Sequence, residues 1–276
     1  YVRIDDTRLD VLDRKHEKGK RRGHLWNFTG DNGDVAYHYT RTWTAKEIAP
    51  VLWQIEGFAQ VDDWKGYESE VLDENGNKRK LIDPERRLGC GMHVRRRFFE
   101  DKKLGGKGST AALVYWKQLY EVEAYAKQKG LDPGARHQLR QEKSLPILRA
   151  FDDWVDQQLD HARPKSRLGK ALRYAQNQRP YIHRCLSNGR FELDNGEPER
   201  QIRKPAVGRK NWLFTGSDKG GRRLATAYSL VQTCIAHDIP VRDYLIDVLT
   251  KIDNGWPFRR LSELLPLRWN ELHRQV

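Results

Sequence analysis

The sequence predicts an α/β protein that combines a mixed β-sheet, flanking helices and an all-helical segment. Two patterns carry this prediction. Residues 1–42 alternate apolar and polar positions as strands do, and helical periodicity recurs from residue 110 onward. Nine Trp, eleven Tyr and eight Phe supply large side chains for a core, although only 38% of the residues are apolar. At 276 residues, the chain is long enough for one large domain or two small ones.

The N-terminal elements are predicted from alternation, turn residues and helix caps. Residues 14–23 read as a basic loop, and Pro50 lies early enough in its helix to be tolerated. The predicted elements are strands at 1–13 (one long or two short), 24–30 and 35–42, a helix capped by Thr44, short strands at 58–62 and within 85–93, and a helix from Val94. Three antiparallel strands, a helix and two further strands are the beginning of a ribonuclease-H-like fold.

The second half of the chain is predicted to be helical. The glycine-rich stretch 103–109 predicts a flexible break. Beyond it, helices are predicted at 110–129, 133–162, 165–186, 220–237 and 241–252, followed by a tail rich in Trp and Pro. In the stretch 193–217, Asp194 and Glu197 have the spacing of a capping box, and Pro205 predicts the end of a short helix.

The charge balance favours a polyanionic partner. Lys and Arg number 51 against 38 Asp and Glu, a net charge of +13, with a pI near 9.6. This excess indicates nucleic acid, although a generally basic protein would show it too. Three widely spaced cysteines indicate neither a disulfide framework nor a zinc ribbon, and they fit a reducing, intracellular setting. No apolar run approaches the ~18 residues of a membrane span. Without an initiating methionine or signal peptide, the chain is expected to be a piece of a longer protein.

Acidic residues occur where a ribonuclease-H-like fold places metal ligands. Two-metal phosphoryl transfer needs several carboxylates that converge on the cations, and Mg²⁺ prefers oxygen ligands. The fold supplies carboxylates from its first strand, the end of its fourth strand and a later helix. The candidates are Asp5 or Asp6, Asp62 or Asp63, and Glu199 or Glu197. Taken singly, each pair also fits ordinary surface acids, and Glu199 also fits a capped, solvated helix.

Several motifs in order carry a family resemblance. They are IDDT and VLD near the start, AQVD at 59–62, GCGMHVRRRFF at 89–99, PKSRLGKALRY at 164–174, and DN-x-x-x-ER at 194–200 continuing into GRKNWLFTGSDKGG at 208–221. With these motifs, nearly the whole chain resembles the catalytic domain of the insertion-sequence-66 family of bacterial transposases, members of the DDE group. The resemblance implies metal-dependent DNA cleavage at transposon ends and strand transfer into target DNA.

The resemblance also selects among the acids. Asp5, Asp62 and Glu199 match the three catalytic carboxylates, which would bind two Mg²⁺ (or Mn²⁺) ions. Asp6 stands where the family usually has Glu, and Asp63-Trp64 replaces the usual Gly-Tyr, so the choice between Asp62 and Asp63 stays open. Gly196 replaces a second Asn, outside the carboxylates. Asp194 and Glu197 then become capping residues.

The resemblance implies four parts of the chain. They are the first part of the ribonuclease-H-like catalytic core (1–102), a helical insertion (103–190), the rest of the core with the third carboxylate (191–252), and a C-terminal tail (253–276). In DDE transposases, such insertions contact DNA ends or a partner subunit.

Basic and aromatic residues around these acids are candidate DNA contacts, because Arg and Lys neutralise phosphates without reading bases. The candidates are Arg203, Arg209, Lys210, Trp212, Arg95, Arg96 and Lys165. Trp212 would stack on an unpaired base or pack in the core. Solvated basic surfaces are the alternative for the others. The implied partners are transposon-end and target DNA, a homo-oligomer on DNA and accessory transposition proteins, in the bacterial cytoplasm at the nucleoid. No membrane partner is expected.

Two other functions remain open from the sequence. One is a DNA-binding fragment of a transposase that is catalytically silent. The other is a nuclease of the same fold that cuts DNA without joining it.

Overall fold

Five strands of this computed structural model follow the order β3-β2-β1-β4-β7. They are β1 (Val2–Leu12), β2 (Lys20–Gly30), β3 (Val35–Thr40), β4 (Ala59–Gln60) and β7 (Arg87–Leu88). β1, β2 and β3 pair antiparallel, whereas β4 and β7 pair parallel. This mixed sheet, followed by many helices, confirms the predicted α/β class and is consistent with a ribonuclease-H-like fold.

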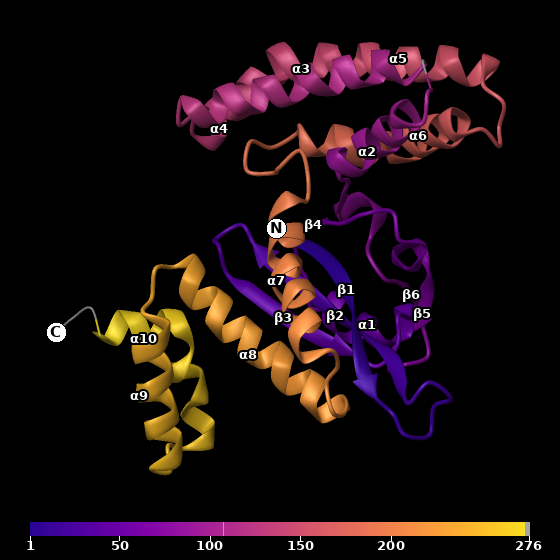
Figure 1. Cartoon of the computed structure of the whole chain (residues 1–276). Helices are drawn as coiled ribbons and strands as arrows, with labels where there is room; N and C mark the ends of the chain where they lie inside the picture. Colours follow the sequence, from indigo (N-terminus) through magenta and orange to yellow (C-terminus); the bar gives the residue numbers. More distant parts are fainter. Residues whose placement is uncertain (107, 274–276) are drawn as a thin grey trace. The chain divides into compact units, whose positions relative to one another are not determined.

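The structure describes residues 1–106 and 108–273. The chain divides into two compact units, which Figure 1 shows in sequence colours. The first unit contains Tyr1 and Leu52–Gly196, and the second contains Val2–Val51 and Glu197–Val276. None of the described helices is long and apolar enough to cross a lipid bilayer.

The structure differs from the sequence prediction at the start of β2 and in the lengths of β4 and β7. Lys20 pairs with Leu12, so the predicted basic loop at 14–23 ends earlier and its last four residues are the start of β2. Backbone pairing with β1 is compatible with the charges of these residues, because Lys20 and Arg22 are exposed and Arg21 is paired with Asp218. The strands predicted at 58–62 and within 85–93 shorten to two residues each, β4 and β7.

The connection between β4 and β7 contains elements that the sequence analysis missed. They are the 3₁₀ turns η1 (Lys65–Glu68) and η2 (Pro84–Arg86) and a hairpin of β5 (Glu70–Leu72) and β6 (Lys78–Lys80). Gly76, with φ of 79°, occupies the left-handed region in the hairpin turn. Helix α1 (Ala45–Leu52) contains Pro50, as predicted.

In the second unit, α8 (Asp218–Ala236) packs along β3 (Figure 1). The core between them is a cluster from all three strands and the helix: Leu9, Val11, Leu25, Val35, Tyr37, Tyr39 and Ala225. Two hydroxyls of α8 bond the outer backbone groups of β3. Ser229 accepts from the Tyr37 N–H at 2.8 Å, and Thr233 accepts from the Val35 N–H at 3.2 Å and donates to its carbonyl at 2.9 Å. The helix therefore satisfies the edge of the sheet.

Helix α7 (Gly196–Trp212) runs through Pro205, although the sequence predicted that it would end there. A proline inside a helix leaves the carbonyl four residues earlier, here Gln201, without its N–H donor. The hydroxyl of Tyr37 donates to that carbonyl at 3.0 Å. Pro205 is also part of the buried stripe Pro198, Gln201, Ile202 and Pro205. The sheet thus supplies the missing donor, and tertiary contact overrides the local stop signal.

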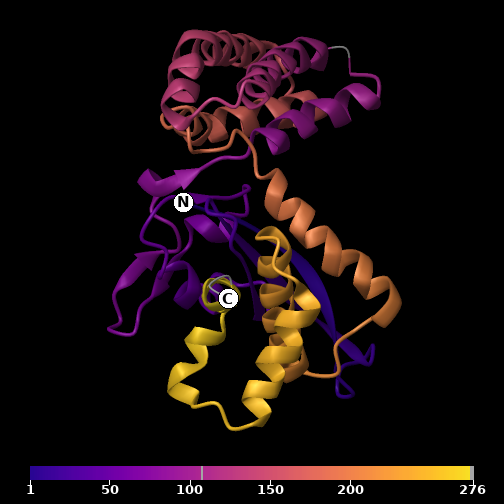
Figure 2. The same ribbon diagram turned by 90° about the vertical axis from the view of Figure 1, so that its left-hand side faces the viewer.

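The C-terminal residues continue the second unit. After α9 (Val241–Asp253), the turn η4 (Phe258–Leu264) leads into α10 (Pro266–His273), near the C-terminal end in Figure 2. The rings of Tyr244 and Trp269 meet edge to face at 5.5 Å, and the Tyr244 hydroxyl donates to the Leu264 carbonyl at 2.8 Å. The Trp269 indole donates to Asp247 at 2.7 Å. The described part of the predicted tail is therefore folded against α9.

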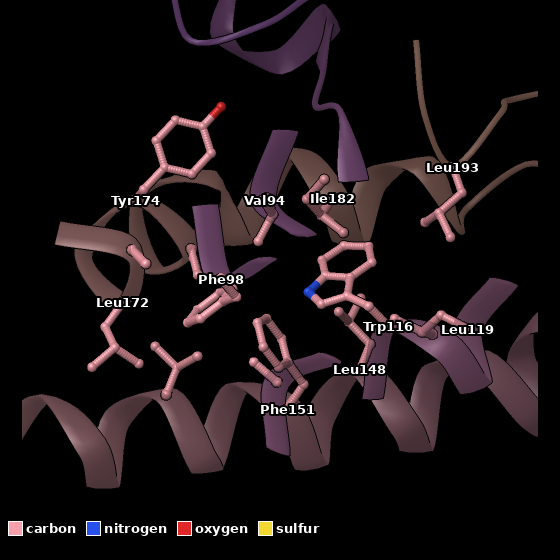
Figure 3. Packing of buried hydrophobic residues seen from close by; sticks show 14 of the residues in the cluster. Val94, Phe98, Trp116, Leu119, Leu148, Phe151, Leu172, Tyr174, Ile182 and Leu193 are labelled. Atoms are coloured by element: carbon pink, nitrogen blue, oxygen red, sulfur yellow. The ribbon is translucent and has the colours of Figure 1, made fainter. Parts of the chain in front are cut away.

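The first unit is dominated by helices. They are α2 (Gly91–Lys103), α3 (Ser109–Gln128), α4 (Pro133–Leu139), α5 (Leu145–His161) and α6 (Arg167–Cys185). The predicted helix 133–162 is interrupted by a π-turn at Arg140–Ser144. The break predicted at 103–109 falls between α2 and α3, and Lys107 within it lies outside the described residues. Phe98, Trp116 and Phe151 point toward one another in the core of these helices (Figure 3).

A buried cation also holds these helices together. Arg140 is fully buried, and Glu123 accepts two hydrogen bonds from it at 2.7 and 2.8 Å. Its guanidinium also donates to the carbonyls of Cys185 and Asn188. A buried charge is tolerated when it is paired and its hydrogen bonds are satisfied, as here.

Asp218 gives the second unit an acid-sensitive contact. Its carboxylate accepts hydrogen bonds from Tyr39, at 2.6 Å, and from Arg21. Burial raises the pKa of Asp218, but these bonds outweigh it, so the pKa lies below its ordinary value. The resulting stability is present above the unfolded pKa of about 3.9 and is lost as the pH falls through the folded pKa.

We expect Asp218→Asn to cost most stability at neutral pH and progressively less as the pH falls below about 4, because the wild-type carboxylate is then protonated as well. Urea unfolding across this range measures the difference. Asp160→Asn, at an exposed position of α5, is the control. A wild-type to variant difference that does not change with pH would contradict the expectation.

Candidate metal and nucleic-acid site

Asp5 lies in a row of polar side chains that crosses the three antiparallel strands. By register, Asp5 is opposite Asn27 on β2, and Asn27 is opposite Tyr37 on β3. Directly opposed residues project from the same face of a sheet. The Tyr37 hydroxyl at the end of this row bonds the Gln201 carbonyl in α7. The face that carries Asp5 is therefore the face against which α7 packs.

A second contact places α7 beside β1. Arg209 of α7 donates to the Thr7 hydroxyl at 3.0 Å and to the Arg8 carbonyl at 2.5 Å. Thr7 shares a face with Asp5 because side chains alternate along a strand. Burial lowers the pKa of Arg209, and the charge of Arg8 lowers it further. Arg209 thus anchors α7 on β1. A contact of Arg209 with a DNA phosphate stays a prediction.

The two adjacent aspartates of β1 have different surroundings. The Asp6 N–H donates to Asp5 Oδ1 at 2.8 Å, which fixes the Asp5 carboxylate. Asp6 projects from the other face, where its oxygens lie 2.6 Å from His24 Nδ1 and 3.2 Å from the Trp43 indole nitrogen. The rings of His24 and Trp43 stack at 5.4 Å. Asp6 is therefore engaged with other side chains, and the choice of Asp5 as a metal ligand stays a prediction.

Glu197 and Glu199, the two acids at the start of α7, also have different surroundings. Glu197 accepts hydrogen bonds from Arg200 and, at 2.9 Å, from the Gln201 amide. Burial raises the pKa of Glu197, but these bonds and the charges of Arg200 and Arg3 bring it below its ordinary value. Glu199 lies on a different side of the helix, on the stripe that contains Arg203 and Lys210 at helical spacing. Both of these basic residues are exposed.

The predicted capping box is not formed as the sequence suggested. The helix begins at Gly196, so the position before it is Asn195 rather than Asp194. Asp194 still accepts the Gly196 N–H at 2.9 Å. Glu197, however, uses its carboxylate on Arg200 and Gln201 within its own helix. The sequence pattern correctly predicted the start of a helix, but the helix begins one residue later than predicted.

Asp62 and Asp63 follow β4 in the first unit. Asp62 Oδ1 accepts the Trp64 N–H at 3.0 Å, and the Asp62 carbonyl accepts from Arg87 at 2.9 Å. Asp63 Oδ1 instead accepts from the Gln178 amide at 2.7 Å and lies 3.6 Å from Arg87. Asp63 is therefore also held by protein side chains, and the choice of Asp62 as a metal ligand stays a prediction.

The three predicted ligands belong to different units. Asp5 and Glu199 are in the second unit, and Asp62 is in the first. Among the residues that the structure describes, no group of three or more His, Cys, Asp and Glu side chains is arranged to hold a metal ion. The structure brings Asp5 and α7 together on one face. Convergence of all three acids stays a prediction.

The predicted DNA contacts are also divided between the units. Arg95 and Arg96 of α2 and Lys165, just before α6, are exposed in the first unit. In the second unit, Trp212 is half-buried and packs against the cluster between β1, β2, β3 and α8. Trp212 therefore contributes to the core, which was one of the two roles predicted for it. Its stacking on a base stays a prediction.

Arg87 and Gln178 were missed by the sequence analysis. Both are buried, at 2% and 1% exposure. One feature of the sequence could have pointed to Arg87. It lies within a predicted strand, and an arginine that is buried there requires a partner. No such feature pointed to Gln178, since its partner Asp63 is 115 residues away in the sequence.

Comparison with known proteins decides the family. Residues 1–223 match the model of the Transposase IS66 family, and residues 229–267 match the IS66 C-terminal element. The chain belongs to the IS66 transposase family. The second match covers the C-terminal part of α8, all of α9 and η4, and the start of α10. The IS66 C-terminal element thus corresponds to the helices that pack around Tyr244.

Relatives of this IS66 chain occur in Sinorhizobium fredii (strain NBRC 101917 / NGR234). The uncharacterized protein y4qI is 34% identical over 98% of this chain and 50% of its own length. The uncharacterized protein y4jD is 27% identical over 96% of this chain and 53% of its own length. The IS66 chain thus spans about half the length of these relatives. No solved structure matches it.

The surroundings of Asp6 predict a structural role. We expect Asp6→Asn to lower the free energy of unfolding by about 1–3 kcal/mol, because the amide replaces one of the two carboxylate oxygens that bond His24 and Trp43. Asp10→Asn is the matched control on the same face of β1, where Asp10 pairs with the exposed Lys20. That surface pair should contribute less than about 1 kcal/mol. Equal losses in urea unfolding would contradict this role for Asp6.

Proposed function

We propose that this chain is a DDE transposase catalytic domain that cleaves DNA at transposon ends and transfers the strand into target DNA. The observation that carries the proposal is the packing of α7, which bears Glu199, on the sheet face that bears Asp5, in a chain whose residues 1–223 match the IS66 family. Asp62 completes the proposed set at the end of β4.

The candidate ligands fit a pair of Mg²⁺ (or Mn²⁺) ions. All three are carboxylates, and hard divalent cations prefer oxygen ligands. In each aspartate pair, a backbone N–H fixes the first acid, while neighbouring side chains engage the second. Asp5, Asp62 and Glu199 would hold the ions. When bound, the ions would activate the attacking water or 3′-hydroxyl and stabilise the leaving oxygen.

Basic residues of the chain would bind and orient the DNA backbone. Arg203 and Lys210 share the α7 stripe with Glu199, so a phosphate that they hold would lie along the same helix face. In the first unit, the exposed residues Arg95, Arg96 and Lys165 would contact further phosphates. Phosphate contacts of this kind position DNA without reading its sequence. Transposon-end and target DNA, a homo-oligomer on DNA, accessory proteins and a cytoplasmic, nucleoid-associated setting all belong to the proposal.

A second candidate is a domain that binds DNA but is catalytically silent by itself. The chain spans about half the length of its curated relatives, so other parts of such proteins would then be needed for activity. DNA binding without Mg²⁺-dependent nicking or joining would favour this candidate. Cleavage without joining would instead indicate a nuclease of the same fold.

We expect Glu199→Gln to abolish Mg²⁺-dependent cleavage of a transposon-end duplex, because an amide replaces the charged oxygen ligand. DNA binding should remain largely intact. Glu197→Gln is the matched control two residues away, since Glu197 bonds Arg200 and Gln201. It should keep most of the cleavage. Undiminished Mg²⁺-dependent cutting by Glu199→Gln would refute the assignment.

We also expect DNA affinity to fall steeply with salt. Arg203→Ala and Lys210→Ala should each reduce the slope of log K against log salt by about 1, because each removes one phosphate contact. Fluorescence anisotropy on a duplex at several salt concentrations measures this slope. Lys117→Ala, at an exposed site of α3 that pairs with Glu121, is the control. A flat salt response of the wild type would contradict phosphate-driven binding.

A further inference from the structure

Asp63, the residue next to Asp62, accepts a hydrogen bond from a helix of the first unit. Gln178 of α6 is 1% exposed, and its Nε2 donates to Asp63 Oδ1 at 2.7 Å. A carboxylate only accepts hydrogen bonds, so the amide must present its NH₂ group to Asp63. The contact joins a buried helix position to the residue that follows Asp62.

Arg87 completes the support on the other side. Its guanidinium is 2% exposed and donates to the Asp62 carbonyl at 2.9 Å. It also lies 3.6 Å from Asp63 and 3.2 Å from Glu68, and it stacks over the Tyr181 ring at 4.4 Å. One buried cation therefore fixes the main chain of Asp62 and the side chain of Asp63 together.

The contacts come from one stripe of α6. Tyr174, Gln178 and Tyr181 are four and three residues apart, so they lie on one helix face. Burial raises the pKa of Tyr174, and the charges of Asp63 and Asp62 raise it further. The Asp62–Asp63 segment thus packs against this face of α6.

We propose that Gln178 is a positioning residue for the second carboxylate of the metal site. By holding Asp63, together with Arg87, it fixes the segment so that Asp62 presents its carboxylate to the cation. The inference rests on the proposed function, because it requires Asp62 to be a metal ligand. It gives part of the helical insertion a role in building the site, in addition to any contact with DNA.

Outer groups that orient a metal ligand contribute strongly to affinity, and their loss typically costs about 10–100-fold. Mg²⁺ is especially sensitive, since it demands near-ideal octahedral geometry. Without the Gln178 bond, Asp63 would keep only its ion pair with Arg87, and the segment that carries the Asp62 carboxylate would be held less firmly. Asp63 contributes through the hydrogen bond that it accepts, so Asp63→Asn, which keeps an acceptor oxygen, should preserve the support.

The test measures Mn²⁺ binding to the chain on a transposon-end duplex by electron paramagnetic resonance. Gln178→Met, which keeps the length of the side chain but lacks the donor, should weaken Mn²⁺ binding by about 10–100-fold. Asp63→Ala should weaken it equally, Asp63→Asn should restore it, and Asp62→Asn should abolish it. Gln178→Met should have no further effect in the Asp63→Ala background. Gln176→Leu is the matched control, because Gln176 is exposed on the same helix.

The outcomes separate the two proposals. If Asp62→Asn abolishes Mn²⁺ binding while Gln178→Met leaves it unchanged, this inference is overturned and the metal site stands. If Asp62→Asn has no effect, the metal site is overturned and the inference with it. Additive losses in the double variant would show that Gln178 does not act through Asp63, which also overturns the inference. If Gln178→Met does not fold, Asp63→Ala and Asp63→Asn decide alone, and equal losses in both overturn it.

Discussion

The hydrogen bond from Tyr37 to the Gln201 carbonyl is the contact on which the second unit depends. Pro205 removes one donor from α7, and the sheet supplies the replacement from β3. The helix can therefore continue to Trp212, so that Arg209 reaches Thr7 on β1. A shorter helix would end before Arg209 and would leave the Asp5 face without its second anchor.

The same arrangement recurs at both aspartate pairs. In each pair, the backbone N–H of a nearby residue binds the first acid, and a nitrogen-bearing side chain from another element binds the second. Two adjacent carboxylates repel each other, and a partner for one lowers that cost. At both positions, the second acid, Asp6 or Asp63, is thus bound by side chains of the protein.

Local pattern was sufficient to predict most of the helices and the three long strands, because periodicity and turn residues act over short distances. It failed at Pro205, where Tyr37 compensates the stop signal from far away in the sequence. It also placed Lys20–Gly23 in a loop, although they pair with β1. The family resemblance selected Asp5, Asp62 and Glu199 as candidate ligands, whereas the contact of Gln178 with Asp63 became visible only in the packed structure.

The hydroxyls of Ser229 and Thr233 have a consequence for assembly. They bond the outward backbone groups of Val35 and Tyr37, which an added strand would otherwise pair with. This edge is therefore closed to strand exchange and to fibre-like stacking. A high local concentration of the protein would therefore not extend the sheet from β3.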